Sequence, residues 1–285
     1  MSLATLRFAS AASSGEVVAS PTKPGAVGAT SGHVLSLVMR RHFSPFKTVI
    51  RRDAGLALLL NPKAATTWIR QVLLDTLQEA GEPPQLGPLW PFTLTRRYLT
   101  APPADLLHFL WNPGQYSLCC FVRNPYARVL SAWRDKFAFR QTGGYSRSTV
   151  RLIPQLRRLA REQGLPGQGA DDSIPFATFL AFIESQAEGT RDHHWDTQRS
   201  ILFTDLLRYS RIYQIETQLI GGMREIFSQL GLPPGGLAAK LCQPLNASRP
   251  LAEPVYTEAL AQRVYALYAG DFNEFGYEAD SWQGM

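Results

Sequence analysis

The stretch LALLLNPKAATTWIRQVLLDTL, residues 56–77, decides the fold class. Its apolar start over residues 56–60 predicts a buried strand, because an unbroken apolar run suits a sheet that is covered on both faces. Apolar residues then recur at helical spacing, at Ile69, Val72, Leu73 and Leu77. A polar loop therefore leads from a strand directly into a helix.

This loop lies in the segment NPKAATTW, residues 61–68, and its residues suit phosphate binding. Unpaired backbone N–H groups at a helix N-terminus, with the positive end of the helix dipole behind them, attract phosphate. Thr66 and Thr67 add hydroxyl donors, and Lys63 adds a positive charge. The same residues also suit an ordinary capped helix start, since threonine is a common N-cap residue.

A second junction, FVRNPYARVLSAW over residues 121–133, repeats this pattern. Residues 118–122 predict another buried strand, and Pro125 suits the first turn of the helix that follows. Arg123 ends the strand and Ser131 lies two turns into the helix, so a guanidinium and a hydroxyl could share a phosphate group. Two phosphate sites on one sheet predict a doubly phosphorylated nucleotide as the ligand.

Alternating strands and helices, with phosphate loops at strand ends, predict an α/β fold in which a P-loop-like parallel sheet is flanked by helices. We interpret residues 45–285 as a single domain, since a hydrophobic content of 45% allows one large core. Residues 1–44 are rich in Ala, Ser, Gly and Pro without sustained periodicity. For this leader we expect disorder over most of its length.

The rest of the chain supplies further predicted elements. Residues 206–215 predict a strand, Glu216 begins a helix, and Gly231 ends it. Residues 255–268 predict a last helix. The segment 146–164 combines arginines with a leucine-rich face, which favours a basic amphipathic helix. Such a helix is typical of a solvated face, and a channel for an anionic acceptor is the alternative.

PKAATTW followed by RNPYARVLSAWRDKF resembles the paired nucleotide-binding motifs of sulfotransferases. The part SAWRDKF is most similar to carbohydrate sulfotransferases of the chondroitin 4-O and HNK-1 type. Three later segments agree in order, namely DHHWDTQ at 192–198, RIYQIET at 211–217 and LYAGDFNEFGYE at 267–278. The resemblance therefore covers residues 56–278 and implies the sulfotransferase fold and activity.

The resemblance implies a donor, 3′-phosphoadenosine 5′-phosphosulfate, whose sulfuryl group passes to an acceptor hydroxyl with release of adenosine 3′,5′-bisphosphate. Lys63, Thr66 and Thr67 would hold the 5′-phosphosulfate, and Arg123 and Ser131 would hold the 3′-phosphate. The full set expected to bind the donor is Pro62, Lys63, Ala64, Ala65, Thr66, Thr67, Trp68, Arg123, Ser131, Ser248 and Arg249.

Two parts of this set have alternatives. Ser248 and Arg249 lie in the segment PLNASRP and would belong to a loop that closes over the nucleotide, but the Asn-Ala-Ser tripeptide is also typical of an ordinary turn. At the position of Ala65, many relatives have a glycine that lets the backbone approach the phosphate closely. Alanine fits there if the residue is helical.

The expected chemistry is an in-line displacement. Lys63 would stabilise the negative charge that grows on the leaving oxygen. A base must take the proton of the acceptor hydroxyl, and histidine suits this role near neutral pH. His194 matches the family's His-Trp dipeptide and is the favoured base, with His193 or a purely structural role as alternatives. Because consecutive side chains diverge, we expect only one of the two histidines to face the donor.

Neighbouring polar residues receive supporting roles. The carboxylates of Asp192 and Asp196 could orient an imidazole, and Trp195 could offer a face to a sugar ring. We interpret Arg128 and Arg134 as surface or ion-pairing residues. The other histidines, expected in the leader, at the surface or at the edge of the core, are His33, His42 and His108.

Composition narrows the choice of ligands and partners. No metal site is indicated, because the His-His pair lacks a third ligand at a spacing typical of zinc. A net charge of +6 suits a polyanionic nucleotide, whereas nucleic-acid binding would need more than this. Two of the three cysteines are adjacent in a predicted buried strand, which favours reduced thiols in a core.

No run reaches the roughly 18 apolar residues that a spanning helix needs, and the leader has no continuous apolar stretch typical of a secretory signal. Golgi relatives of the resembled family carry a membrane anchor, and this sequence shows no run that could form one. We therefore expect a soluble cytoplasmic enzyme of bacterial origin, with organellar import as an alternative.

The expected acceptor is a carbohydrate hydroxyl. The alternatives are a lipid or small-molecule hydroxyl, a P-loop-like nucleotide kinase and a binding module without turnover. The sequence lacks the glycine-rich phosphate loop that a kinase would need. The sequence makes no prediction about the oligomeric state.

Overall fold

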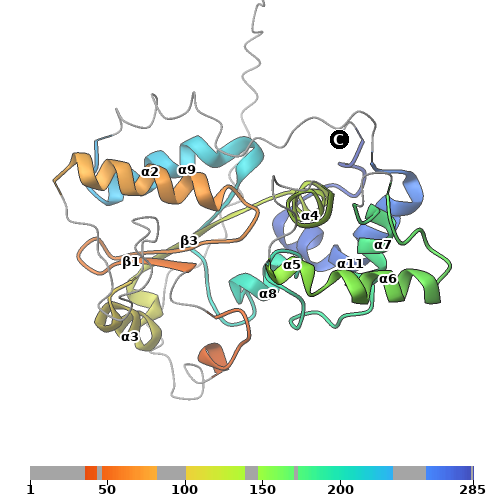
Figure 1. Ribbon diagram of the computed structural model, residues 1–285. Helices are drawn as coiled ribbons and strands as arrows, with labels where there is room; N and C mark the ends of the chain where they lie inside the picture. The colour runs from red at the N-terminus through yellow and green to blue at the C-terminus, as the bar shows by residue number, and fades with distance from the viewer. Residues whose placement is uncertain are drawn as a thin grey trace, which may run out of the picture.

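The computed structural model describes residues 36–43, 47–81, 101–138, 147–169, 173–233, 255–283 and 285. Within these residues a four-stranded sheet has the order β1-β2-β3-β4 (Figure 1). Strands β2 (Leu56–Leu59), β3 (Ser117–Val122) and β4 (Arg211–Gln214) run parallel, and β1 (Thr48–Arg51) is antiparallel to β2. The predicted α/β fold with a parallel sheet is therefore confirmed, with one antiparallel strand at its edge.

Helices α2 (Thr66–Glu79) and α9 (Ile215–Gln229) cover one face of the sheet (Figure 1). Leu58, Phe121 and Tyr213 point to this face and share a buried cluster with both helices. Their strand neighbours point the other way, because successive side chains alternate along a strand.

The opposite face packs against α3 (Pro103–Trp111), α8 (Gln198–Leu202) and the end of the last helix. The strand residues in this second cluster are Ile50, Ala57, Leu59, Leu118, Cys120 and Val122. Burial on both faces explains why the parallel strands β2 and β3 are unbroken apolar runs. Cys119 and Cys120 are both buried free thiols, as predicted, one in each cluster.

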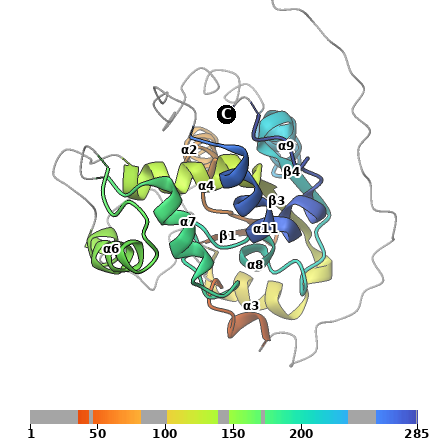
Figure 2. The ribbon, with the colours of Figure 1, turned by 90° about the vertical axis from the view of Figure 1, so that its right-hand side faces the viewer.

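A third cluster lies among helices beside the sheet (Figures 1 and 2). It joins α4 (Pro125–Trp133), α6 (Ile153–Glu162), α7 (Phe176–Glu184) and α11 (Glu258–Phe275). A single π-helical turn, η3 (Arg134–Ala138), extends α4. Two shorter elements are η2 (Pro113–Gln115) and α5 (Arg147–Val150). Because α4 begins where β3 ends, this cluster fixes the second predicted phosphate loop against the rest of the domain.

Two predicted elements have wrong boundaries. The strand predicted over 206–215 is only Arg211–Gln214, because Phe203 has a φ of 55° and the chain turns there. Leu207 donates its backbone N–H back to the Phe203 carbonyl in this turn. Ile215 then already belongs to α9, one residue before the predicted start.

The two other predicted helices also differ from the structure. The segment 146–164 forms α5 and α6 rather than one helix, and Pro154 lies in the first turn of α6, where a proline is tolerated but cannot continue an earlier helix. The last helix extends beyond 268 to Phe275, with a kink at Tyr268, and ends at Gly276 with a φ of 68°.

The predicted leader, residues 1–44, is described over 36–43 only. There Leu37 and His42 are buried, so this part of the segment packs onto the domain. His33, Cys242 and the predicted closing loop with Asn246, Ser248 and Arg249 lie outside the described residues. In the described part of the chain, none of the helices has the length and apolar character needed to cross a membrane.

Candidate functional site

The loop between β2 and α2 has an unusual backbone. Lys63 and Ala65 have φ values of 68° and 55°, in the left-handed region that favours glycine. The Ala64 N–H donates to the Asn61 carbonyl at 3.2 Å, and the Thr66 hydroxyl donates to the same oxygen. The loop is thus a tight turn, which places Lys63 immediately before the first turn of α2.

The predicted donor-binding residues of this loop divide by exposure. Ala64 and Trp68 are buried, so only their backbone is available to a ligand. Pro62 and Thr66 are partly exposed and Thr67 is exposed. Lys63 and Thr67 therefore have side chains available at this helix start, whereas the Thr66 hydroxyl already donates to the Asn61 carbonyl. Their roles in donor binding stay predictions.

Ala65 is not helical, so the condition under which alanine would fit this position is not met. Helix α2 begins at Thr66, and the left-handed φ of Ala65 explains why a glycine suits this position. We expect Ala65→Gly to raise the free energy of unfolding by about 0.5–1 kcal/mol, because an L-residue in this region costs about 1–2 kcal/mol. Denaturant unfolding measures the change.

Ala64→Gly is the matched control for this prediction. Ala64 is 1% exposed and is not among the residues with positive φ, so the same substitution removes a buried methyl group without relieving strain. It should lower the stability. Equal losses in both variants would show that the backbone of Ala65 is not strained.

The second loop lies against the first. The Arg123 guanidinium, at the end of β3, donates to the Lys63 carbonyl at 3.1 Å. Asn124 caps α4 by accepting hydrogen bonds from the Tyr126 and Ala127 N–H groups. Arg123 and Lys63 are therefore brought together as predicted. Ser131 is partly exposed two turns into α4, as its position in the sequence predicts.

Gln198 ties both loops together, which the sequence did not indicate. Its side-chain oxygen accepts from the Asn61 side chain at 2.7 Å and from the Arg123 N–H at 2.9 Å. Its amide nitrogen donates to the Arg123 carbonyl at 2.8 Å. Gln198 is fully buried, and Asp271 anchors its backbone N–H at 2.7 Å. In the sequence, Gln198 stood out only as the last residue of the DHHWDTQ segment.

The histidine segment contains an aspartate–histidine pair. His194 Nδ1 lies 2.6 Å from Asp192 Oδ1, and the His194 N–H donates to the same oxygen at 2.9 Å. An ionised carboxylate only accepts, so a neutral His194 donates from Nδ1 and keeps Nε2 as a proton acceptor. The predicted orientation of an imidazole by a carboxylate is therefore confirmed for Asp192.

The two histidines do not diverge as predicted. Their ring centroids are 4.1 Å apart with an interplanar angle of 34°, so both rings lie on the same side of the segment. Burial, together with the neighbouring His194, Lys47 and His42, lowers the pKa of His193 to about 3. Burial also lowers the pKa of His194, and the bond to Asp192 offsets this only in part.

The electrostatic surroundings distinguish the two rings. Lys63 and Lys136 act on the pKa of His194, whereas Lys47 and His42 act on that of His193. The charge of the lysine loop therefore acts on His194 and is not among the causes of the His193 shift.

Trp195 is not available to a sugar ring, contrary to the prediction. It is 3% exposed and packs against Phe137 and Phe179 in the helical cluster. Its Nε1 donates to the Gln186 side chain at 3.1 Å. Trp195 therefore anchors the histidine segment in the core.

Lys63 has a carboxylate partner. Its ammonium donates to Asp135 of η3, which also pairs with Lys136 at 3.0 Å. The Lys63 side chain is only 15% exposed. Burial lowers its pKa, and the Asp135 contact opposes this effect. An incoming anion would have to replace Asp135 as the partner of this lysine.

Arg128 is buried, which corrects its interpretation as a surface residue. It is 1% exposed and donates Nε to the Pro62 carbonyl at 3.1 Å. Its Nη1 donates to the Asp196 carbonyl at 2.6 Å and its Nη2 to the His193 carbonyl at 3.1 Å. Arg134 is partly exposed. The sequence could not predict the contacts of Arg128, because its acceptors are backbone carbonyls, which every residue type has.

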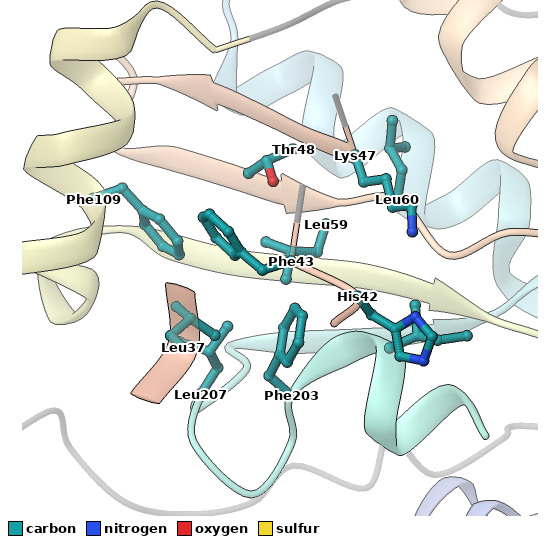
Figure 3. A pocket seen from close by; sticks show the side chains of 11 residues that line it. Leu37, His42, Phe43, Lys47, Thr48, Leu59, Leu60, Phe109, Phe203 and Leu207 are labelled. Carbon is teal, nitrogen blue, oxygen red and sulfur yellow. The ribbon is translucent and has the colours of Figure 1, made fainter. Parts of the chain in front are cut away.

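A small pocket lies beside the site, between β1, β2, α3 and α8 (Figure 3). Lys47 and His42 are at the end of the pocket where β2 and β3 end, and Phe109 and Leu37 are at the other. Its volume of about 10 Å³ leaves room for about one water molecule. The pocket is therefore too small for an acceptor.

The polar end of this pocket is charged and buried. His42 Nε2 lies 2.6 Å from Asp196 Oδ2, and both residues are buried, whereas a surface or core-edge position was expected for this histidine. Burial lowers the pKa of Lys47 to about 8. Because β1 is antiparallel, its first residues lie at the carboxyl end of β2, and the Leu60 N–H donates to the Lys47 carbonyl at 2.7 Å.

Among the residues that the structure describes, one group could hold a metal ion. Ligand atoms of Asp192, His193 and His194 lie within 4.8 Å of one another. The sequence prediction considered only a third ligand at a spacing typical of zinc, and it did not consider Asp192, which directly precedes the pair. These atoms already form the hydrogen bond of the aspartate–histidine pair, and three lysines act on the same rings. This favours an acid–base role over metal binding.

The fold and the site define the class of the protein. Two cationic strand-to-helix loops, linked at the carboxyl end of a parallel sheet, are typical of proteins that bind phosphorylated nucleotides. The model of the sulfotransferase family matches residues 106–278, and the chain belongs to this family. The match includes the arginine loop and the histidine segment and begins after the lysine loop.

Individual relatives agree with this assignment. Carbohydrate sulfotransferase 12 of Mus musculus is 27% identical over 180 residues, which are 57% of this chain and 40% of the relative. Carbohydrate sulfotransferase 11 of Mus musculus is 25% identical over 179 residues, 59% of this chain and 48% of the relative. The chain thus spans less than half the length of these curated relatives. No solved structure matches it significantly.

These relatives, and a further one from Danio rerio, are vertebrate proteins. The comparisons therefore give no support to the predicted bacterial origin.

Proposed function

We propose that this protein transfers a sulfuryl group from 3′-phosphoadenosine 5′-phosphosulfate to an acceptor hydroxyl. The observation that carries this proposal is the hydrogen bond from Arg123 to the Lys63 carbonyl, because it joins the two phosphate loops. One nucleotide with phosphates at both ends could then contact both loops. Lys63, Thr66 and Thr67 would hold the 5′-phosphosulfate, and Arg123 with Ser131 the 3′-phosphate.

The site also offers groups for the chemistry. The acceptor oxygen forms a bond to sulfur while the bond from sulfur to the bridging oxygen breaks, and the electron pair stays on the bisphosphate. Lys63 stabilises the charge that grows on this leaving oxygen. The acceptor proton moves to Nε2 of His194, whose Nδ1 is held by Asp192. Lys63 leaves Asp135 as the donor binds.

The proposed acceptor is a carbohydrate hydroxyl. Support comes from the names of the relatives, which are carbohydrate sulfotransferases, and from the SAWRDKF segment. A lipid or small-molecule hydroxyl would leave the donor loops unchanged and is therefore an outcome of the test.

Donor dependence tests the proposal. The purified full chain is incubated with sulfur-labelled donor, or with ATP labelled on its γ-phosphate and Mg²⁺, and with a panel of desulfated glycans, sterols and small alcohols. We expect only the sulfur label to reach an acceptor, and a glycan to be the best one. We also expect calorimetry to show tighter binding of adenosine 3′,5′-bisphosphate than of adenosine 5′-monophosphate. Equal affinities, or transfer of phosphate, would contradict the proposal.

A further inference from the structure

We propose that Arg128 is a positioning residue, which sets the separation between the leaving-group lysine and the histidine base. This inference rests on the proposed function, in which Lys63 and His194 act from opposite sides of the sulfuryl group. Arg128 touches neither side chain. It binds the backbone carbonyls of Pro62 and His193, the residues that directly precede Lys63 and His194.

The geometry of the contacts suits such a role. The guanidinium is planar and rigid, so its Nε and Nη2 donors hold the two acceptor carbonyls at a fixed spacing. A third bond, from Nη1 to the Asp196 carbonyl, fixes the histidine segment on its other side. A displacement of either segment would therefore break a buried hydrogen bond of a charged group, which costs more than a neutral one.

Arg128 is not available as a phosphate ligand. All three of its nitrogen atoms are engaged with carbonyl oxygens, and the residue is 1% exposed. Arg123 and Lys63 have the exposure and position to meet a phosphate instead. The binding of the nucleotide and the alignment of the reacting groups are thus assigned to different residues.

The fold does not depend on Arg128 alone to bring these segments together. Gln198 also joins the histidine segment to Asn61 at the start of the lysine loop, and Trp195 anchors the segment in the helical cluster. Loss of the guanidinium should therefore loosen the alignment while both loops stay in place. An error of about 1 Å in such an alignment can lower a rate about 100-fold.

The experiment compares Arg128→Lys with Arg263→Lys in the full chain. Arg263 makes a two-point contact with Glu184, between α11 and α7, and belongs to none of the site contacts. We expect Arg128→Lys to lower kcat about 100-fold and to change the affinity for adenosine 3′,5′-bisphosphate by less than about threefold. Arg263→Lys should leave both values unchanged. A native kcat in folded Arg128→Lys would overturn the inference.

Two further measurements separate positioning from general stability. In a Lys63→Ala background, Arg128→Lys should lower kcat by less than about threefold, because coupled residues are not additive. If Arg128→Lys lowers kcat as much in this background as in the natural chain, Arg128 does not act through Lys63. In addition, NMR titration of the histidine rings should show the pKa of His194 moving towards its ordinary value of 6.5 in Arg128→Lys but not in Arg263→Lys.

The NMR measurement does not require activity. If the natural chain transfers no sulfuryl group but the His194 titration moves, the proposed function fails and the positioning contact stands. If Arg128→Lys does not fold, Arg128→Gln is the second variant, since it keeps an amide donor without the charge. Unfolding of both variants would show a purely structural arginine and would overturn the inference.

Discussion

Lys63→Ala is expected to lower kcat by about 10²–10³, the usual effect of removing one group that stabilises a developing oxyanion. The physical reason is that the lysine meets its full partner charge only as the bond between sulfur and the bridging oxygen breaks. Adenosine 3′,5′-bisphosphate should still bind, because Arg123 and the N–H groups of α2 remain. Steady-state transfer of labelled sulfuryl groups and calorimetry with the bisphosphate measure the two effects.

Lys136→Ala is the matched control for this variant. Lys136 contacts the same carboxylate as Lys63, that of Asp135, at 3.0 Å. Its loss changes the local charge equally but leaves the Lys63 ammonium in place, so kcat should fall by less than about tenfold. Unchanged turnover in Lys63→Ala would remove this lysine from the mechanism. If the natural chain binds the bisphosphate but transfers nothing, it is a binding module.

His194→Ala should lower kcat by about 10²–10⁴, the contribution typical of a positioned general base. His193→Ala should have a much smaller effect, because His194 carries the bond to Asp192 and responds to the charge of Lys63. Rates of sulfuryl transfer at saturating donor measure both variants. A larger loss in His193→Ala would exchange the two roles.

The pH profile adds an independent check on His194. A base acts in its neutral form, and burial holds the pKa of His194 below its ordinary value of 6.5. The value of kcat/KM should therefore stay level as the pH falls through 6.5 and decline only at lower pH. Asp192→Asn removes the charge that favours the protonated ring, so the decline should move to still lower pH. A decline centred above 6.5 in the natural chain would exclude this histidine.

The sequence predicts the parts of the site that follow local rules. Apolar runs give β2 and β3, and the polar segments after them give the loops with Lys63 and Arg123. The carboxyl ends of parallel strands meet at one edge, so the meeting of both loops also follows from the pattern. The role of Asp192 as the partner of His194 was predicted because the two residues are close in the chain.

The parts that the sequence does not predict depend on distant backbone atoms. Arg128 and Gln198 bind carbonyl and N–H groups from several segments, and every residue type offers those groups. Trp195 lies in a polar stretch of sequence and was expected to offer a face to a sugar ring, yet the helical cluster buries it. The left-handed backbone of Ala65 also needs the structure, since alanine itself favours a right-handed helix.

The crowding of four cations, Lys47, Lys63, Arg123 and Arg128, has a consequence for the stability of the protein. Burial lowers the pKa of all four groups. For Lys47, Lys63 and Arg123, neighbouring cations lower the pKa further. The charged neighbours of Arg128 are acidic or phenolic groups instead. Like charges held together away from water raise the free energy of the empty protein. A polyanion in their midst removes this repulsion and binds only the folded chain. The melting temperature should therefore rise when a polyanion such as adenosine 3′,5′-bisphosphate is added.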